Sequence, residues 1–206
     1  MIVIIDYGVG NLFSLKSSFK AAGEEAIVSS DPQVIKAADK LVLPGVGAFG
    51  DAAEKLNKSG LEAVIAEQVD MGKPLLGICL GMQLLFEESY EYGCHKGLGF
   101  IKGSIVPLKG KIPEDLNIPH IGWNELKITQ SSPLLKYVKE GDCVYFVHSY
   151  YALCDDKNIV ALSEYGTQVT ACVSNGNVYG CQFHPEKSGR VGLSILKAFC
   201  ELGESK

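Results

Sequence analysis

The chain has 206 residues, of which 47% are hydrophobic and 21% charged, and its formal net charge at pH 7 is −5. These values are typical of one soluble globular domain spanning residues 1–206. No basic stripe is present, which argues against a nucleic-acid partner. The longest apolar runs, such as residues 2–5 and 74–78, are too short to cross a membrane, and no signal peptide is expected.

The first half of the chain alternates strand and helix patterns. Strands are predicted at residues 1–6, 25–29, 40–43 and 74–78. Helices are predicted at residues 12–22, in a short segment opened by Asp31-Pro32, and at residues 51–57, 61–71 and 80–88. Asn11 and Gly23 are expected to cap the first helix. This βαβα order predicts a mostly parallel sheet flanked by helices on both faces.

The second half is rich in β-strand and turn residues. These patterns cover residues 98–108, 120–128, 142–151 and 159–183. Within the last of these, Asn175-Gly176 is a strong hairpin signal, and a final helix is predicted at residues 191–202. The predicted fold class is therefore α/β, with an antiparallel β extension attached to the parallel sheet.

The cysteines and glycines exclude several kinds of site. Seven cysteines are scattered without a Cys-x-x-Cys pair, which argues against a zinc motif and favours a reducing, cytoplasmic location. His95, His120 and His148 do not form a metal-ligand spacing, so no metal is expected. The segment that begins Gly8-Val9-Gly10 has Phe13 where a dinucleotide fingerprint needs glycine, and no P-loop is present. No cofactor is therefore expected.

One cysteine lies in a pattern that points to chemistry. Gly77-Ile78-Cys79-Leu80-Gly81 follows a predicted strand and precedes a predicted helix, as in the nucleophile elbow of hydrolases. The glycines two positions either side leave room for a sharp turn, and the helix N-terminus favours a thiolate. The alternative is a buried cysteine in a glycine-rich turn.

A second pattern supplies a base. In His184-Pro185-Glu186, proline restricts His184 to an extended conformation, in which positions two apart point to one side. The Glu186 carboxylate is therefore expected to reach the imidazole and orient it, as the third member of a triad does. Alone, the pattern also fits a loop histidine beside an exposed glutamate.

A third pattern could bind an oxyanion. Pro44-Gly45-Val46-Gly47 follows the third predicted strand, where the N–H of Val46 or Gly47 could point to a substrate oxygen. The N–H of Leu80 would be the other donor of an oxyanion hole. A plain glycine turn is the alternative.

Together these residues resemble the class I, triad-type glutamine amidotransferases. The resemblance lies in Gly-Ile-Cys-Leu-Gly-Met-Gln at 77–83 and Gln-Phe-His-Pro-Glu-Lys at 182–187. Residues 6–11, 43–49, 118–124 and 145–150 also resemble the glutaminase subunits of imidazole glycerol phosphate synthase, an enzyme of histidine biosynthesis. The resemblance covers essentially the whole chain and implies the class I amidotransferase (flavodoxin-like) fold.

The resemblance also implies a role for each site residue. Cys79 would attack the side-chain amide of glutamine, His184 would protonate the leaving ammonia and activate water, and Glu186 would orient His184. The implied substrate-binding residues are Gly45, Gln83, Glu91, Ser149 and Tyr150. Ammonia would pass to a separate (β/α)8 cyclase subunit in a heterodimer, where it helps form imidazole glycerol phosphate and an aminoimidazole carboxamide ribotide. The implied interface residues are Asn11, Trp123, Asn124 and Lys187.

Three other readings remain open from the sequence alone. A paralogous subunit could serve another amidation pathway, such as surface-sugar synthesis, and only the partner would distinguish it. A catalytically dead docking subunit conflicts with the intact Cys79, His184 and Glu186. A thiol hydrolase acting alone on γ-glutamyl peptides conflicts with the long match outside the candidate triad.

Overall fold

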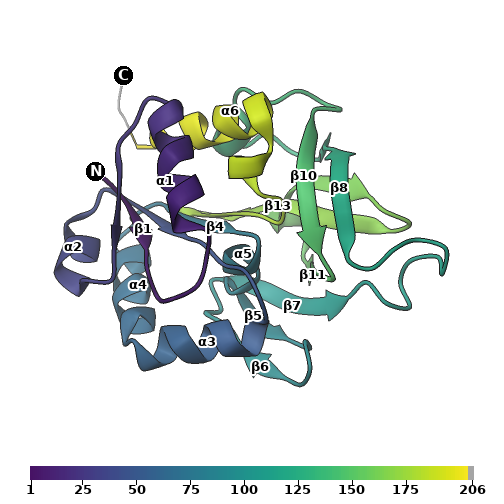
Figure 1. Ribbon diagram of the computed structural model, residues 1–206, viewed down its shortest axis with the longest axis horizontal. Coiled ribbons are helices and arrows are strands. Elements are labelled where there is room, and N and C mark those ends of the chain that lie inside the picture. The colour runs from purple at the N-terminus through teal and green to yellow at the C-terminus, as the bar shows by residue number, and fades with distance from the viewer. Residues whose placement is uncertain (204–206) are drawn as a thin grey trace.

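The computed structural model describes residues 1–203 and has an eight-stranded sheet at its centre, in the order β2-β1-β3-β4-β14-β13-β12-β9 (Figure 1). The first five strands are parallel. They are β2 (Ala26–Ser29), β1 (Ile2–Ile5), β3 (Lys40–Leu43), β4 (Leu75–Ile78) and β14 (Val178–Cys181). The antiparallel extension consists of β13 (Gln168–Asn175), β12 (Ile159–Glu164) and β9 (Lys127–Ile128). The predicted fold class is confirmed.

Helices cover both faces of the parallel part, as predicted. Alternate residues of a strand point to opposite faces, so Ile2 and Ile4 pack in one buried cluster while Val3 and Ile5 pack in another. The first cluster lies under α1 (Leu12–Ala21) and α6 (Gly189–Cys200), and Figure 1 shows these two helices together on one side of the sheet. The second lies against α2 (Pro32–Ala37), α3 (Phe49–Lys58) and α4 (Leu61–Asp70).

The caps of the first two helices follow the sequence. Asn11 Oδ1 accepts a hydrogen bond from the Ser14 N–H at 3.4 Å, and Asp31 Oδ1 accepts one from the Gln33 N–H at 2.8 Å. Gly23 adopts a φ of 99° directly after the C-cap residue Ala22, a conformation that glycine adopts at low cost.

The helix predicted at residues 80–88 is wrong in its length. The α5 helix (Leu80–Gln83) has one turn, and β5 (Phe86–Ser89) begins three residues later. β5 pairs with β7 (Ile101–Pro107) and with β6 (His95–Lys96), and Phe86 is fully buried. Pairing and burial therefore override the helical pattern, since local propensity is a weak preference beside tertiary contacts.

Two smaller sheets complete the fold. One has the order β11-β7-β5-β6, and the other pairs β8 (His120–Glu125) with β10 (Cys143–His148). Ser149 connects β10 to β11 (Tyr150–Cys154), so the chain passes from one small sheet to the other at this residue. Short 3₁₀ helices occur at η1 (Pro133–Leu135), η2 (Asp156–Asn158) and η3 (Pro185–Lys187). Within residues 1–203, no helix is both long and apolar enough to cross a bilayer.

Candidate active site

Three turns meet at the carboxyl edge of the parallel sheet. β4 lies between β3 and β14, in register with both. The residues that follow these strands therefore emerge side by side at one edge: Pro44 after β3, Cys79 after β4 and Gln182 after β14. Ligands bind at this edge in open parallel sheets. The strand order thus brings together three sequence patterns, the first and last of which lie about 140 residues apart.

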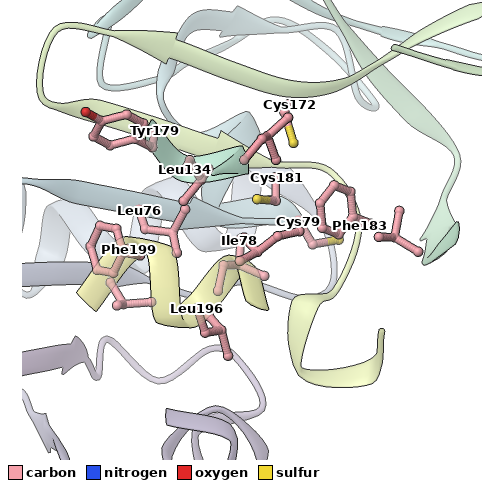
Figure 2. Close-up of a cluster of buried hydrophobic side chains, with 14 of the residues drawn as sticks. Leu76, Ile78, Cys79, Leu134, Cys172, Tyr179, Cys181, Phe183, Leu196 and Phe199 are labelled. Carbon is pink, nitrogen blue, oxygen red and sulfur yellow. The ribbon is translucent and has the colours of Figure 1, made fainter. Parts of the chain in front are cut away.

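Cys79 occupies the elbow that the glycine spacing predicts. Its φ of 53° and ψ of −111° are unusual for a residue with a side chain. A Cβ added to Gly77 would lie 2.7 Å from Gly81 O, and one added to Gly81 would overlap Leu43 O. The turn therefore needs both glycines. The Cys79 side chain is only 7% exposed and belongs to the buried cluster shown in Figure 2, with Ile78, Cys181 and Phe183.

His184 and Glu186 form the predicted pair. Their Nδ1 and Oε1 atoms are 2.8 Å apart, and both side chains are almost completely buried. His184 is extended, as predicted, with a φ of −98° and a ψ of 98°. The rest of the predicted route is wrong, because Glu186 lies in η3 and a 3₁₀ turn returns its carboxylate to the imidazole. The other carboxylate oxygen, Oε2, is buried without a hydrogen-bond partner in residues 1–203.

Ser188 anchors this turn to the rest of the molecule. Its hydroxyl donates to His184 O at 2.6 Å and accepts from the Tyr145 N–H at 2.9 Å, while the His184 N–H donates to Tyr145 O at 3.0 Å. Tyr145 belongs to β10, so His184 is attached both to the main sheet and to the smaller β8-β10 sheet. Three hydrogen bonds to one short segment restrict the position of the imidazole.

The surroundings of His184 favour its charged form. Burial lowers the pKa of this imidazole, but hydrogen bonding to Cys79 and to Glu186, together with their negative charges, outweighs burial and raises the pKa to about 9. An imidazolium beside a thiol is the arrangement that activates a cysteine nucleophile. This electrostatic arrangement favours acyl-transfer chemistry at Cys79.

A cavity of about 370 Å³ opens over Cys79 and contains most of the predicted site. Its walls include all of the following predicted residues: Val46, Gly47, Cys79, Leu80, Gln83, Glu91, Ser149, Tyr150, His184 and Lys187. A larger cavity, of about 600 Å³, lies at the opposite edge, where residues such as Met1, Lys40 and Pro74 line it. No histidine lines that cavity, so the smaller one is the better candidate. No group of three potential metal ligands occurs in the described chain.

Gly45 does not line the cavity but packs beneath it. A Cβ at Gly45 would lie 2.7 Å from the Gly81 N atom, so the backbones of the Pro44 turn and the elbow touch. The Tyr7 hydroxyl donates to Pro44 O at 2.7 Å and holds the same turn from the end of β1. Burial raises the pKa of Tyr7, and so does the nearby Cys79. Tyr7 has no predicted role, although it lies in a segment that resembles the family.

A buried polar chain connects the cavity wall with the thiol. Gln83 Nε2 donates to Tyr150 O and to Gln182 Oε1, each at 3.1 Å, and Gln182 Nε2 lies 3.9 Å from Cys79 Sγ. Gln182 is fully buried and was not among the predicted site residues. Its position two residues before His184 is the signal that could have identified it, because alternate residues of an extended chain share a face.

One oxygen of the Glu91 carboxylate accepts a hydrogen bond within the protein. Its Oε2 accepts a hydrogen bond from the Phe49 N–H at 2.6 Å, at the first residue of α3. Ala48, the N-cap residue, has no capping side chain, so Glu91 satisfies this helix end from a distant segment. The interaction fixes Glu91 at the cavity wall.

The four predicted interface residues are more scattered. Lys187 lines the cavity, and its Nζ lies 5.9 Å from the centroid of the Tyr145 ring. Trp123 is 57% exposed on β8. Its neighbour Asn124 points to the opposite face and donates to Glu164 O at 2.7 Å. Asn11 caps α1. Their roles at an interface stay predictions.

Comparison with known proteins finds similarity over nearly the whole length of this chain. The family described as glutamine amidotransferase class-I matches residues 3–201. Imidazole glycerol phosphate synthase subunit HisH of Lactococcus lactis subsp. lactis is 49% identical over 201 residues, covering 97% of this chain and 98% of the relative. The subunit of the same name from Bacillus licheniformis is 52% identical over 202 residues, covering 97% of this chain and 95% of the relative.

Solved structures show the same fold at much lower identity. The structure of PurLQS from Thermotoga maritima superimposes with a TM-score of 0.76 at 20% identity and covers 98% of both chains. A structure described as a glutamine amidotransferase gives a TM-score of 0.74 at 18% identity, covering 97% of this chain and all of the other. The chain therefore belongs to the class I glutamine amidotransferase family, in the group of the HisH subunits of imidazole glycerol phosphate synthase.

Proposed function

We propose that this protein hydrolyses glutamine to glutamate and ammonia through Cys79, His184 and Glu186. The observation that carries the proposal is the buried contact of His184 with Glu186 on one side and Cys79 on the other, at the floor of a 370 Å³ cavity. A thiol, an imidazole and a carboxylate in this order form a nucleophilic triad. The full-length similarity to HisH subunits supports the same activity.

The reaction follows from the positions of these groups. The Cys79 thiolate adds to the side-chain amide carbon of glutamine, and the N–H groups of Leu80 and of Val46 or Gly47 stabilise the oxyanion. The His184 imidazolium gives its proton to the departing ammonia, which leaves a γ-glutamyl thioester on the sulfur. Neutral His184 then takes a proton from water, which attacks the thioester and releases glutamate. Glu186 holds the imidazole throughout.

The polar groups of the cavity suit an amino-acid substrate. One carboxylate, Glu91, faces the site and would bind the α-amino group of glutamine. Gln83 and the backbone of Ser149 and Tyr150 supply neutral polar contacts to the rest of the substrate. The cavity thus offers an acceptor for the ammonium and hydrogen-bonding groups for the other polar atoms.

Ammonia serves a separate cyclase in this proposal. The relatives are named as subunits of imidazole glycerol phosphate synthase, which favours a heterodimer with a (β/α)8 cyclase of histidine biosynthesis over a paralogous amidation pathway. The cyclase would cover the edge that contains Cys79, because ammonia released into water is protonated and lost. We place this complex in the cytoplasm, with no membrane or nucleic-acid partner.

Glutamate release and covalent labelling test the proposal. The purified chain, mixed with the cyclase and its ribonucleotide ligand, should release one glutamate for each glutamine consumed, and Cys79→Ala should abolish this release. A glutamine-analogue electrophile should modify Cys79 and leave the exposed Cys94 unmodified. Labelling at Cys94 in place of Cys79, or full activity in Cys79→Ala, would overturn the proposed nucleophile.

A further inference from the structure

Two histidines outside the triad form a buried pair, and one of them, His148, lines the cavity. His120 begins β8 and His148 ends β10, and the antiparallel register places them opposite each other. Directly opposed residues on one face of a sheet are close enough for their side chains to interact, and here His120 Nδ1 and His148 Nε2 are 3.1 Å apart. Both residues are buried, with exposures of 2% and 6%.

Aromatic neighbours fix the plane of the first ring. The His120 ring stacks on Tyr165 with a centroid separation of 3.9 Å and on Phe146 at 4.8 Å. The Tyr165 hydroxyl in turn donates to Asn117 O at 2.8 Å. A ring held between two aromatic faces cannot rotate freely, so its nitrogens point in fixed directions.

The hydrogen bonds of the pair can run in only one direction. His148 Nδ1 lies 2.9 Å from Tyr150 O, and a carbonyl oxygen only accepts, so Nδ1 carries the proton. Burial lowers the pKa of His148 to about 3 and that of His120 to about 4, so both rings are neutral at pH 7. His148 Nε2 is then an acceptor, and His120 Nδ1 must donate to it.

The series of hydrogen bonds from His120 through His148 ends at the backbone that lines the cavity. Tyr150 O accepts two hydrogen bonds, one from His148 Nδ1 and one from Gln83 Nε2 at 3.1 Å. Ser149 and Tyr150 form the cavity wall at the point where the chain passes from the β8-β10 sheet to the β11-β7 sheet. The Leu108 N–H holds the Ser149 carbonyl at 2.9 Å, while the two side-chain donors hold the Tyr150 carbonyl.

We propose that His120 and His148 are a positioning pair, in which His120 Nδ1–H donates to His148 Nε2 and His148 Nδ1–H donates to Tyr150 O, so that the Ser149-Tyr150 backbone is held for substrate binding. Neither histidine touches the reacting atoms in this scheme. The inference rests on the proposed glutaminase function for its kinetic consequence, but its hydrogen-bond pattern is independent of that function. His120 and His148 are two of the three histidines that do not form a metal-ligand spacing in the sequence.

Kinetics of matched variants test the positioning role. An asparagine side chain places an amide N–H where His Nδ1 lies, whereas leucine keeps bulk without a donor. In the complex with the cyclase, His148→Leu should raise the KM for glutamine about tenfold and leave kcat within about threefold, the effect expected for one lost buried hydrogen bond in ground-state binding. His148→Asn should bring the KM most of the way back to the wild-type value. In the same way, the KM of His120→Asn should lie closer to the wild-type value than that of His120→Leu.

Spectra of the unaltered chain test the pair without any assay of activity. Two-bond ¹⁵N–¹H correlation spectra distinguish the two neutral tautomers of histidine, and both His120 and His148 should show the Nδ1–H form. An Nε2–H form at either residue would overturn the proposal, and so would equal KM values for the leucine and asparagine variants. If glutamine is not hydrolysed at all, the proposed function fails, while the spectra still decide the pair.

Discussion

Replacing Glu186 by glutamine removes one charge from the candidate triad and keeps its shape. The carboxylate Oε1 lies 2.8 Å from His184 Nδ1, and its charge helps to hold the pKa of that imidazole at about 9. Burial by itself lowers this pKa, so glutamine should let it fall. An amide can also donate its N–H to Nδ1 and select the wrong tautomer, which reduces kcat about 10⁴-fold in a comparable triad.

The same change should alter how stability depends on pH. The pKa of His184 is raised from 6.5 to about 9 by folding. A raised pKa stabilises the folded state fully below pH 6.5, and this stabilisation is lost as the pH rises through 9. At about 1.36 kcal/mol for each pH unit, the loss is roughly 3 kcal/mol. Glu186→Gln should reduce this slope, and the part that Cys79 contributes should remain.

Urea unfolding at pH 6.5 and pH 9 measures the difference, with ammonia release measured in parallel. Glu114→Gln is a suitable control, because Glu114 is exposed in a loop away from the cavity. The control should keep the wild-type slope and activity. If Glu186→Gln kept the wild-type dependence of unfolding free energy on pH, the assigned charge on His184 would be wrong.

Three further predictions concern the partner and the elbow. Binding of the cyclase and its ligand should raise the rate of glutamine hydrolysis, measured as glutamate release, about 10²- to 10³-fold above that of the isolated chain, if binding supplies a missing oxyanion donor at the glycine-flanked Val46; equal rates with and without the cyclase would refute gating of the oxyanion hole. Lys187→Ala should weaken this stimulation or the affinity seen by calorimetry, with the partner-free rate unchanged. Gly81→Ala should lower the unfolding free energy by about 1–3 kcal/mol, measured in urea, because its Cβ overlaps Leu43 O; a smaller loss would mean that the elbow relaxes.

Local sequence signals predict the parallel half of the fold well. β3 occupies the predicted residues, Asn11 caps α1 as expected, and Asp31-Pro32 opens α2 as expected. These features depend on residues close together in the chain. The glycines around Cys79 predict the elbow for the same reason, because the steric limit they satisfy lies within the turn itself.

Features that depend on distant contacts are the ones that sequence patterns miss. The one-turn α5 helix and the strand β5 reflect pairing with β7, which no local pattern encodes. Tyr7, His148 and Gln182 contribute through hydrogen bonds to segments far along the chain. Their partners become neighbours only when the sheets assemble.

The strand order has a consequence for synthesis of the chain. β14 is the last strand to be made, yet it lies between β4 and β13 near the middle of the sheet. Until residue 178 has left the ribosome, β4 has an open edge, a feature that invites aggregation. Cys79 is by then present without His184. In the proposed mechanism, the nascent protein therefore has its thiol without its base, and it can hydrolyse glutamine only after β14 has joined the sheet and has brought His184 beside Cys79.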